Sequence, residues 1–203
     1  MQTAIERFYA DIVLIGVSTG GPYALAEVIP RLPGDLGVPL LVVQHMPSMF
    51  TRRLAKSLDK QSALKVREAE HFDPLLPNTV YIAPGGKHML LGPALGGKSV
   101  IQLNDGSPEN NCKPSVDTLF RSGATNFSGR ICAVIMTGIG IDGTEGLRLI
   151  KRRPAWVIAQ NEATSMVFGM PKEAIDAGVV DVISPLEEIA QEICKAIQGF
   201  WQI

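Results

Sequence analysis

The chain has 203 residues, of which 46% are apolar and 19% are charged, and its formal net charge is −1. This composition is too apolar for a disordered chain, and it offers no basic excess for non-specific binding of nucleic acid. Its apolar runs are too short for the ~20 residues of a membrane span, and the first ten residues lack the apolar region of a signal peptide, so neither membrane insertion nor secretion is expected.

Eight strand-like runs alternate with helix-like segments along the chain. Several runs are apolar without interruption, such as residues 12–15, 40–43 and 133–136, as strands covered on both faces of a parallel sheet require. Most of the segments between them begin at a proline, which favours the first turn of a helix. We expect strands at 11–17, 38–44, 64–68, 79–83, 99–103, 131–136, 155–160 and 179–183, and helices at 22–32, 47–58, 114–127, 144–153, 171–177 and 185–200.

This alternation predicts an α/β fold in a single domain over residues 1–203: a doubly wound, mainly parallel sheet between helix layers. The length fits one large domain. Residues 64–110 combine strand-like runs with many turn residues, so we expect a small β excursion there on the same domain.

A glycine-rich sequence, Gly-Val-Ser-Thr-Gly-Gly at 16–21, follows the first predicted strand and precedes a helix. Gly16 and Gly20 allow a tight turn that would expose the hydroxyl of Ser18, as in the Gly-x-Ser-x-Gly nucleophile elbow. The same sequence also suits a turn that binds a phosphate or nucleotide, although the dinucleotide fingerprint and the Walker lysine are both missing. The residues of this turn leave both interpretations open.

Two more polar groups follow apolar strands. His45 ends the second strand, where it is either a general base for Ser18 or a histidine on the surface. Asp142 lies in the glycine-rich loop 137–143, where its carboxylate either orients a histidine or caps a helix. Because each residue follows a predicted parallel strand, we expect the three to converge. Their chain order differs from that of the α/β-hydrolases, so that fold is not expected.

The remaining candidates are weaker. His71 is expected on the surface, and His88 is either structural or lines a pocket. The histidines show no H-x-x-x-H spacing and the three scattered cysteines form no C-x-x-C pair, so we expect no metal site, no disulfide framework and no cofactor. Without a disulfide framework or a signal peptide, we expect a cytoplasmic protein.

Six segments carry the motifs of the chain in order: 15–21, 44–51, 81–89, 114–117, 137–143 and 159–171. Taken together, they resemble the catalytic domain of the bacterial chemotaxis protein-glutamate methylesterases, the CheB family. The resemblance extends over about residues 11–197, and it implies an α/β domain with a parallel sheet and a catalytic triad of Ser18, His45 and Asp142. Thr19 would support the imidazole, and the backbone at Ile139 would donate to the oxyanion.

The resemblance also implies a substrate and a reaction. The substrate would be a glutamyl γ-methyl ester on the cytoplasmic part of a methylated chemoreceptor, with deamidation of receptor glutamines as related chemistry. Arg52, Arg53 and Lys56 form a basic helix face beside His45 that either meets acidic receptor helices or is an ordinary solvated face. Alternatives from other classes are a non-catalytic interaction module and a nucleotide-binding domain that uses the turn at 16–21.

The chain departs from the family pattern at two places. Cys112-Lys113 stands where the family usually has His-Arg, and we interpret Cys112 as an ordinary thiol because no histidine motif accompanies it. Only about ten residues precede the first predicted strand, so we expect no phosphorylatable receiver domain in this chain. A receiver would then be a separate or removed part, and the chain either a catalytic fragment or an enzyme that acts alone.

Overall fold

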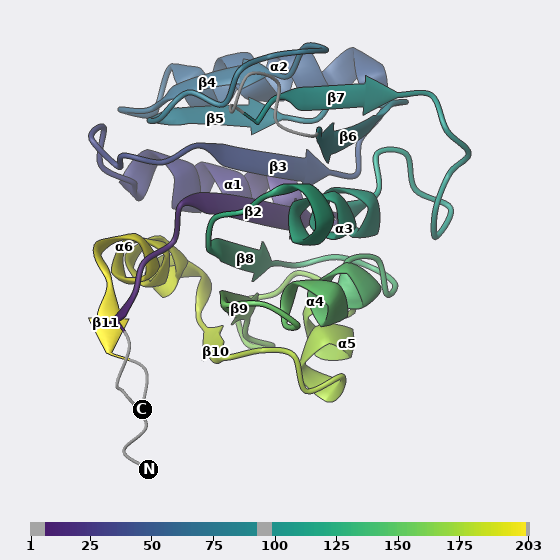
Figure 1. The fold of residues 1–203 in the computed structure, drawn as a ribbon. Helices are drawn as coiled ribbons and strands as arrows, with labels where there is room; N and C mark the ends of the chain where they lie inside the picture. Colours follow the sequence, from purple (N-terminus) through teal and green to yellow (C-terminus); the bar gives the residue numbers. More distant parts are fainter. Residues whose placement is uncertain (1–6, 93–98, 202–203) are drawn as a thin grey trace.

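Seven parallel strands form the central sheet, in the order β10-β9-β8-β2-β3-β5-β4 (Figure 1). The structure is a computed structural model that describes residues 7–92 and 99–201. All residues of β2, β3, β5 and β8 are buried, which agrees with the uninterrupted apolar runs of the sequence. The strands are β2 (Ile12–Val17), β3 (Leu40–Gln44), β4 (Lys65–Glu68), β5 (Thr79–Ile82), β8 (Ile131–Ile135), β9 (Ala155–Gln160) and β10 (Val182–Ser184).

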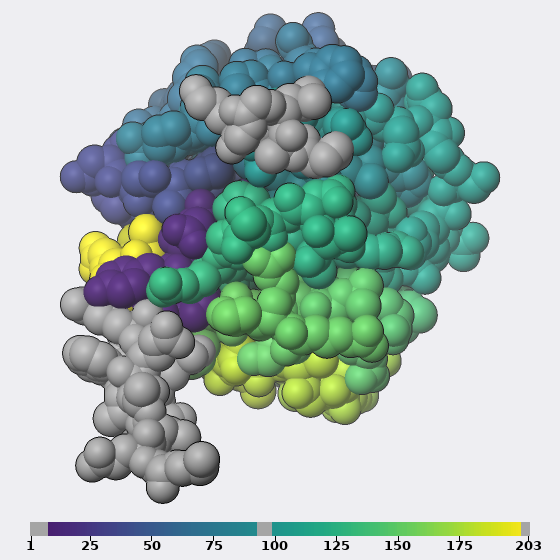
Figure 2. Space-filling model, in the orientation of Figure 1, coloured from purple at the N-terminus to yellow at the C-terminus, as the bar shows by residue number. Residues whose placement is uncertain are grey.

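Two helix layers cover the two faces of this sheet. Successive residues of β2 alternate between them, so that Val13 and Ile15 pack into one apolar core and Ile12 and Leu14 into the other. The first layer holds α1 (Gly21–Val28), α2 (Ser48–Asp59) and α6 (Ile189–Gln198), with the short helices η1 (Ile29–Arg31) and η2 (Leu186–Glu188). The second holds α3 (Val116–Asn126), α4 (Thr144–Ile150) and α5 (Met170–Asp176), the green segments of Figure 2.

The prediction of a doubly wound, mainly parallel sheet is confirmed, but the β excursion is smaller than expected. β4 and β5 belong to the main sheet, since β5 is apolar on both faces and pairs with β3 on one side and β4 on the other. Only β6 (His88–Leu91) and β7 (Ile101–Asn104) leave it, as an antiparallel pair. β6 lies outside the strands that the sequence predicted. A further two-stranded pair joins the chain ends, β1 (Arg7–Phe8) with β11 (Phe200–Trp201).

The order of the strands places β2 between β3 and β8. The chain moves from β2 to one edge through β3 and then crosses to the other side through β8, so the winding direction reverses beside β2. In open α/β sheets, ligands bind outside the carboxyl ends of the strands at this point. None of the described helices, the longest of which has 12 residues, is long and apolar enough to cross a membrane.

Candidate active site

The three residues singled out by the sequence follow three neighbouring strands. Ser18 follows β2, His45 follows β3, and Asp142 lies in the loop after β8. Backbone hydrogen bonds tie these loops together, because the His45 N–H donates to the Val17 carbonyl at 3.1 Å and the Ser18 N–H donates to the Thr137 carbonyl at 2.9 Å. The predicted convergence at one edge of the sheet is therefore found.

Gln44 is a buried link between the ends of β2 and β3. Its side-chain amide donates to the carbonyl of Ser18 at 3.0 Å and to that of His45 at 2.9 Å. The amide packs against Gly21, where any side chain would collide with it. Gln44 therefore fixes the backbone of both residues, a role that its place beside His45 in the sequence did not reveal.

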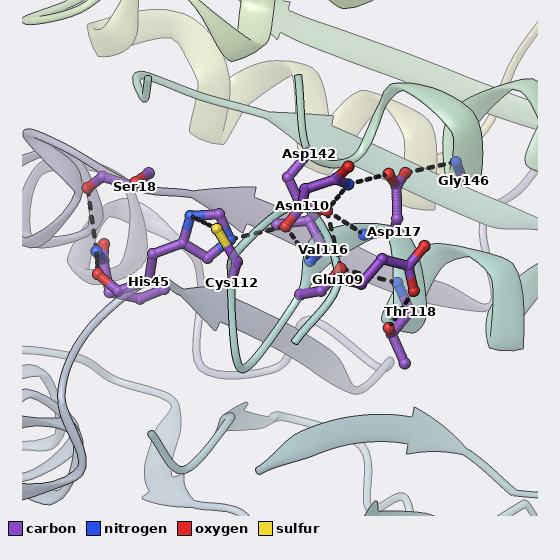
Figure 3. A network of polar contacts seen from close by, with 12 residues as sticks. Ser18, His45, Glu109, Asn110, Cys112, Val116, Asp117, Thr118, Asp142 and Gly146 are labelled. Carbon is purple, nitrogen blue, oxygen red and sulfur yellow. Dashed lines mark hydrogen bonds and ion pairs between the residues drawn. The ribbon is translucent and has the colours of Figure 1, made fainter. Parts of the chain in front are cut away.

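His45 and Asp142 form a close pair. Nε2 of His45 lies 2.8 Å from Oδ2 of Asp142, and their side chains are 13% and 2% exposed. Figure 3 shows the carboxylate at the centre of a polar network that reaches from the imidazole to α3. The aspartate therefore orients the histidine, as one of the two sequence interpretations proposed.

The Asp142 carboxylate also occupies the N-terminus of α3. It accepts hydrogen bonds from the backbone N–H groups of Val116 at 2.7 Å and Asp117 at 3.1 Å, from the Ser115 hydroxyl at 2.8 Å and from the Asn110 amide at 3.0 Å. The first turn of a helix carries unpaired N–H groups and the positive end of its dipole, so an anion is stabilised there. The alternative that Asp142 caps its own helix does not hold, because α4 begins without a side-chain cap.

These donors keep the Asp142 carboxyl ionised, and the ionised carboxylate in turn selects the tautomer of His45. Burial by itself would raise the pKa of the Asp142 carboxyl, but the hydrogen bonds from His45, Asn110 and the α3 backbone outweigh it and lower the pKa to about 2. At neutral pH the carboxylate is ionised and accepts the Nε2 proton. The unprotonated nitrogen of a neutral His45 is therefore Nδ1.

Cys112 contacts Nδ1, the second ring nitrogen of His45. Its Sγ lies 3.5 Å from Nδ1 of His45. Burial and, to a lesser degree, the charge of Asp142 raise the pKa of the Cys112 thiol to about 11, so the thiol is protonated at neutral pH and its S–H donates to Nδ1. The raised pKa agrees with the interpretation of Cys112 as an ordinary thiol, but the reason given for it, that no histidine accompanies the cysteine, is wrong. The two residues lie 67 positions apart in the chain, and no local pattern connects them.

Ser18 makes no hydrogen bond to His45 among the described contacts. In Figure 3 it lies on the side of the imidazole away from Asp142, the same side as the nitrogen that Cys112 contacts. Its Cβ packs against the α-carbon of Gly138, where a methyl group would come within 2.7 Å of it. The serine is thus packed against the loop after β8.

Thr19 and Ile139 are the two supporting residues that the family resemblance implies. The side chain of Thr19 is exposed, and its described contact is through its carbonyl, which accepts from the Thr137 hydroxyl at 2.9 Å. It forms no described contact with the imidazole. Ile139 follows Gly138, whose N–H donates to Val167 at 3.0 Å and whose carbonyl accepts from Met170 at 2.9 Å. The peptide of Ile139 is therefore part of a loop fixed beside Ser18.

Asp117 and Asn110 form an outer layer that the sequence did not indicate as functional. The Asn110 amide bridges the carboxylates of Asp117, at 2.8 Å, and Asp142. Asp117 also accepts from the Gly146 N–H at 2.7 Å. Burial and the neighbouring charge of Asp142 outweigh these hydrogen bonds and raise the pKa of the Asp117 carboxyl to about 6. Asn110 adopts a left-handed backbone (φ 52°), which asparagine tolerates better than most residues.

Three further sequence interpretations are resolved by the structure. Gly16 does not form the turn, since it is paired within β2 and leaves room for the side chain of Val116. His88 is buried and structural: its Nε2 lies 2.9 Å from the Ser107 carbonyl, and its Nδ1 accepts from the Ser115 N–H at 3.2 Å. His71 is exposed, as expected.

The fold and the site define a doubly wound α/β protein with a serine and an Asp-His pair at the switch point of the sheet. The family model of the CheB methylesterases matches residues 13–193. The chain belongs to this family.

The similarity to individual proteins agrees with this family assignment. The chain is 48% identical over 96% of its length to a protein-glutamate methylesterase/protein-glutamine glutaminase of Desulfotalea psychrophila, and 46% identical over 92% to one of Archaeoglobus fulgidus. It covers 54% and 53% of these two proteins, so it spans about half the length of the curated relatives it matches. The crystal structure of the Thermotoga maritima CheB methylesterase catalytic domain superimposes with a TM-score of 0.87 at 42% identity, covering 92% of this chain and 98% of that one.

Proposed function

We propose that this chain is the catalytic domain of a protein-glutamate methylesterase that hydrolyses γ-methyl esters on the cytoplasmic part of chemoreceptors and deamidates receptor glutamines. The observation that carries the proposal is the chain of contacts from α3 through Asp142 to Nε2 of His45, with Nδ1 turned toward Ser18. A nucleophile, a base and a group that orients the base are the parts that acyl transfer requires. The names of the relatives support this reaction.

The reaction uses each group in turn. Ser18 Oγ attacks the γ-carbonyl carbon of the ester while its proton passes to Nδ1 of His45. The charge on the carbonyl oxygen is stabilised by the backbone N–H of Ile139. Collapse of this intermediate breaks the bond to methoxide, which takes the proton from His45 and leaves as methanol. Water then repeats the sequence on the acyl-enzyme, and glutamate and free Ser18 result. A glutamine substrate loses ammonia in place of methanol.

The resting site must rearrange slightly for this chemistry. Nδ1 of His45 is hydrogen-bonded to Cys112, so Ser18 has to replace the thiol before it can transfer its proton. A thiol is a weak donor, and the exchange costs little. Catalytic hydrogen bonds are often formed only in the complex with substrate.

The surface around the site suits a protein substrate. Six of the ten large apolar side chains that are exposed among the described residues lie at this edge of the sheet, in the first turns of α1 and α2 and in the loops after β8 and β9. Gathered exposed apolar groups mark a surface for protein contact. They are Tyr23, Met49, Phe50, Ile139, Ile141 and Met166.

A basic flank adjoins this apolar rim. Arg52, Arg53 and Lys56 are exposed on α2, the helix that follows His45, and Arg52 is paired with Glu68 at 3.1 Å. Such charges favour the approach of an acidic partner more than they add to its affinity. The proposed partner is an acidic helix of the receptor in the cytoplasm.

The test is methanol release from receptor membranes that carry radiolabelled methyl esters, with the wild-type chain and Ser18→Ala measured together. We expect release by the wild type and none above background by the variant. Full activity of Ser18→Ala would exclude Ser18 as the nucleophile. No release by either would favour the alternatives, a non-catalytic module or, if a nucleotide binds at the turn 16–21, a nucleotide-binding domain.

A further inference from the structure

His45 and Cys112 are spaced as two ligands of one tetrahedral metal ion. Nδ1 of His45 and Sγ of Cys112 lie 3.5 Å apart. Nitrogen and sulfur ligands at the usual distances from a tetrahedral zinc ion are also about 3.5 Å apart. The weak S–H···N hydrogen bond of the resting site therefore keeps the two atoms where a zinc ion would hold them.

The surroundings of His45 match those of a zinc-bound histidine. Histidines that bind a metal usually donate their other ring N–H to a carboxylate, which fixes the tautomer and turns the free nitrogen toward the ion. Asp142 does this at Nε2 with a distance of 2.8 Å. The ligand atoms of His45, Cys112 and Asp142 all lie within 4.8 Å of one another, so the carboxylate charge is close to the ion's position.

The site is open to solvent on the side of Cys112. A cavity of about 530 Å³ is lined by His45, Met46, Gly86, Asn111, Cys112 and Lys113, among others. The amino group of Lys113 donates to the carbonyls of Asp105 and Gly106, which keeps this cation away from the ligands. Water entering through the cavity can complete the coordination.

We propose that Cys112 and His45 bind Zn²⁺ as a pair, with Asp142 behind the imidazole, and that the bound ion reversibly inhibits the esterase. On binding, the S–H bond of Cys112 breaks and its proton goes to solvent, while Zn–S and Zn–N bonds form without any change of oxidation state. The thiolate and imidazole ligands favour zinc over magnesium or calcium. Inhibition follows because the ion takes the lone pair of Nδ1, and this part rests on the proposed function.

Binding is tested first without reference to activity. Protein treated with a chelator is titrated with Zn²⁺ by calorimetry, and with Co²⁺ while the thiolate-to-cobalt charge-transfer absorption is followed. We expect one ion per chain in the wild type and in Cys194→Ser, which removes a half-buried thiol of α6 and serves as the matched control. Cys112→Ser and His45→Asn should bind Zn²⁺ about tenfold more weakly or worse, and the cobalt absorption should be missing in Cys112→Ser.

Unchanged binding by Cys112→Ser, or no binding by the wild type, would overturn the metal site. Where binding is found, the second test is inhibition. Zinc should inhibit methanol release by the wild type, and a chelator should restore it. Cys112→Ala should need about tenfold more zinc or worse for the same inhibition. Binding without any esterase activity in the wild type would leave the metal site standing and reject the proposed function. Zinc binding at Cys112 without loss of activity would reject the inhibition.

Discussion

Asp142 fixes which nitrogen of His45 is free, because its Oδ2 lies 2.8 Å from Nε2. The carboxylate is itself held by the first turn of α3, so the orientation of the histidine depends on a helix that follows it by 71 residues in the chain. This relationship makes α3 part of the site, although no side chain of α3 contacts the imidazole in the described network. It also leads to predictions that local features of the sequence do not offer.

Replacing Asp142 by asparagine should reduce kcat/KM for methanol release by about a thousandfold or more, because the amide holds the wrong tautomer of the imidazole. The variant should also lose about 1–3 kcal/mol of unfolding free energy, since donors at the α3 N-terminus lose their acceptor. Steady-state kinetics and urea unfolding measure the two effects. Asp105→Asn, the same change at an exposed aspartate, is the control and should alter neither. A fully active Asp142→Asn would exclude a role for the pair in catalysis.

The stability of the domain should fall steeply at acid pH because of Asp142. Its pKa is lowered to about 2 from an ordinary value of 3.8. The ionised group therefore contributes stability that is complete above pH 4 and is lost as the pH falls through 2, by about 2 kcal/mol in total. Urea unfolding across pH 2–5 measures it. In Asp142→Asn this part of the pH dependence should disappear, and an unchanged slope would refute the assignment.

Asp117 should make the folding stability change with pH in the direction opposite to Asp142. Its pKa is raised to about 6, so the folded state holds the proton more tightly than the unfolded one, and stability falls as the pH rises from 4 through 6. The size is about 2–3 kcal/mol. Urea unfolding of Asp117→Asn against the wild type should show this fall removed. A wild-type stability that rises over the same interval in step with Asp117 would contradict the raised pKa.

Cys112 should compete with Ser18 for Nδ1 of His45. Cys112→Ala removes the competitor and should raise kcat/KM by up to about fivefold, the equivalent of one weak hydrogen bond. Cys112→Ser supplies a stronger donor and should lower it below the wild type. In a methanol-release assay with metal chelated, kcat/KM should be highest for Cys112→Ala, intermediate for the wild type and lowest for Cys112→Ser. The reverse order would show that the thiol assists the base.

Gly138 should tolerate no side chain. A methyl group there would lie 2.7 Å from Cβ of Ser18 and would also meet the sulfur of Met170. Gly138→Ala should therefore displace Ser18 and reduce kcat by at least about tenfold, with about 1–3 kcal/mol of overpacking strain. Gly34→Ala, remote from the site and with its nearest neighbour Ala63 at 3.3 Å, is the control and should keep full activity. Unchanged kinetics of Gly138→Ala would show that Ser18 is not confined by this glycine.

The sequence by itself predicted the sheet and the edge at which the site lies. Uninterrupted apolar runs such as residues 40–43 of β3 can only be buried between two helix layers, and parallel strands between helices place their carboxyl ends together. Ser18, His45 and Asp142 each follow such a strand, so their convergence was predictable from the chain. The position of β4 and β5 in the main sheet was not predictable, because the sequence of a short strand does not indicate which strand it pairs with.

The tertiary structure decided how the site is built inside that edge. Cys112 and Asn110 carry no local signal of function, and Gln44 is marked only by its place beside His45. Each acts through a partner that folding brings to it. Asp142 was expected either to orient a histidine or to cap its own helix. Packing placed it against His45, as the first alternative has it, and on the N-terminus of α3 in place of its own helix. Hydrogen bonds between distant loops depend on the distances and directions of a few atoms, which spacing along the chain does not contain. That is why the sequence showed the edge of the sheet and the structure alone showed which nitrogen of His45 is free.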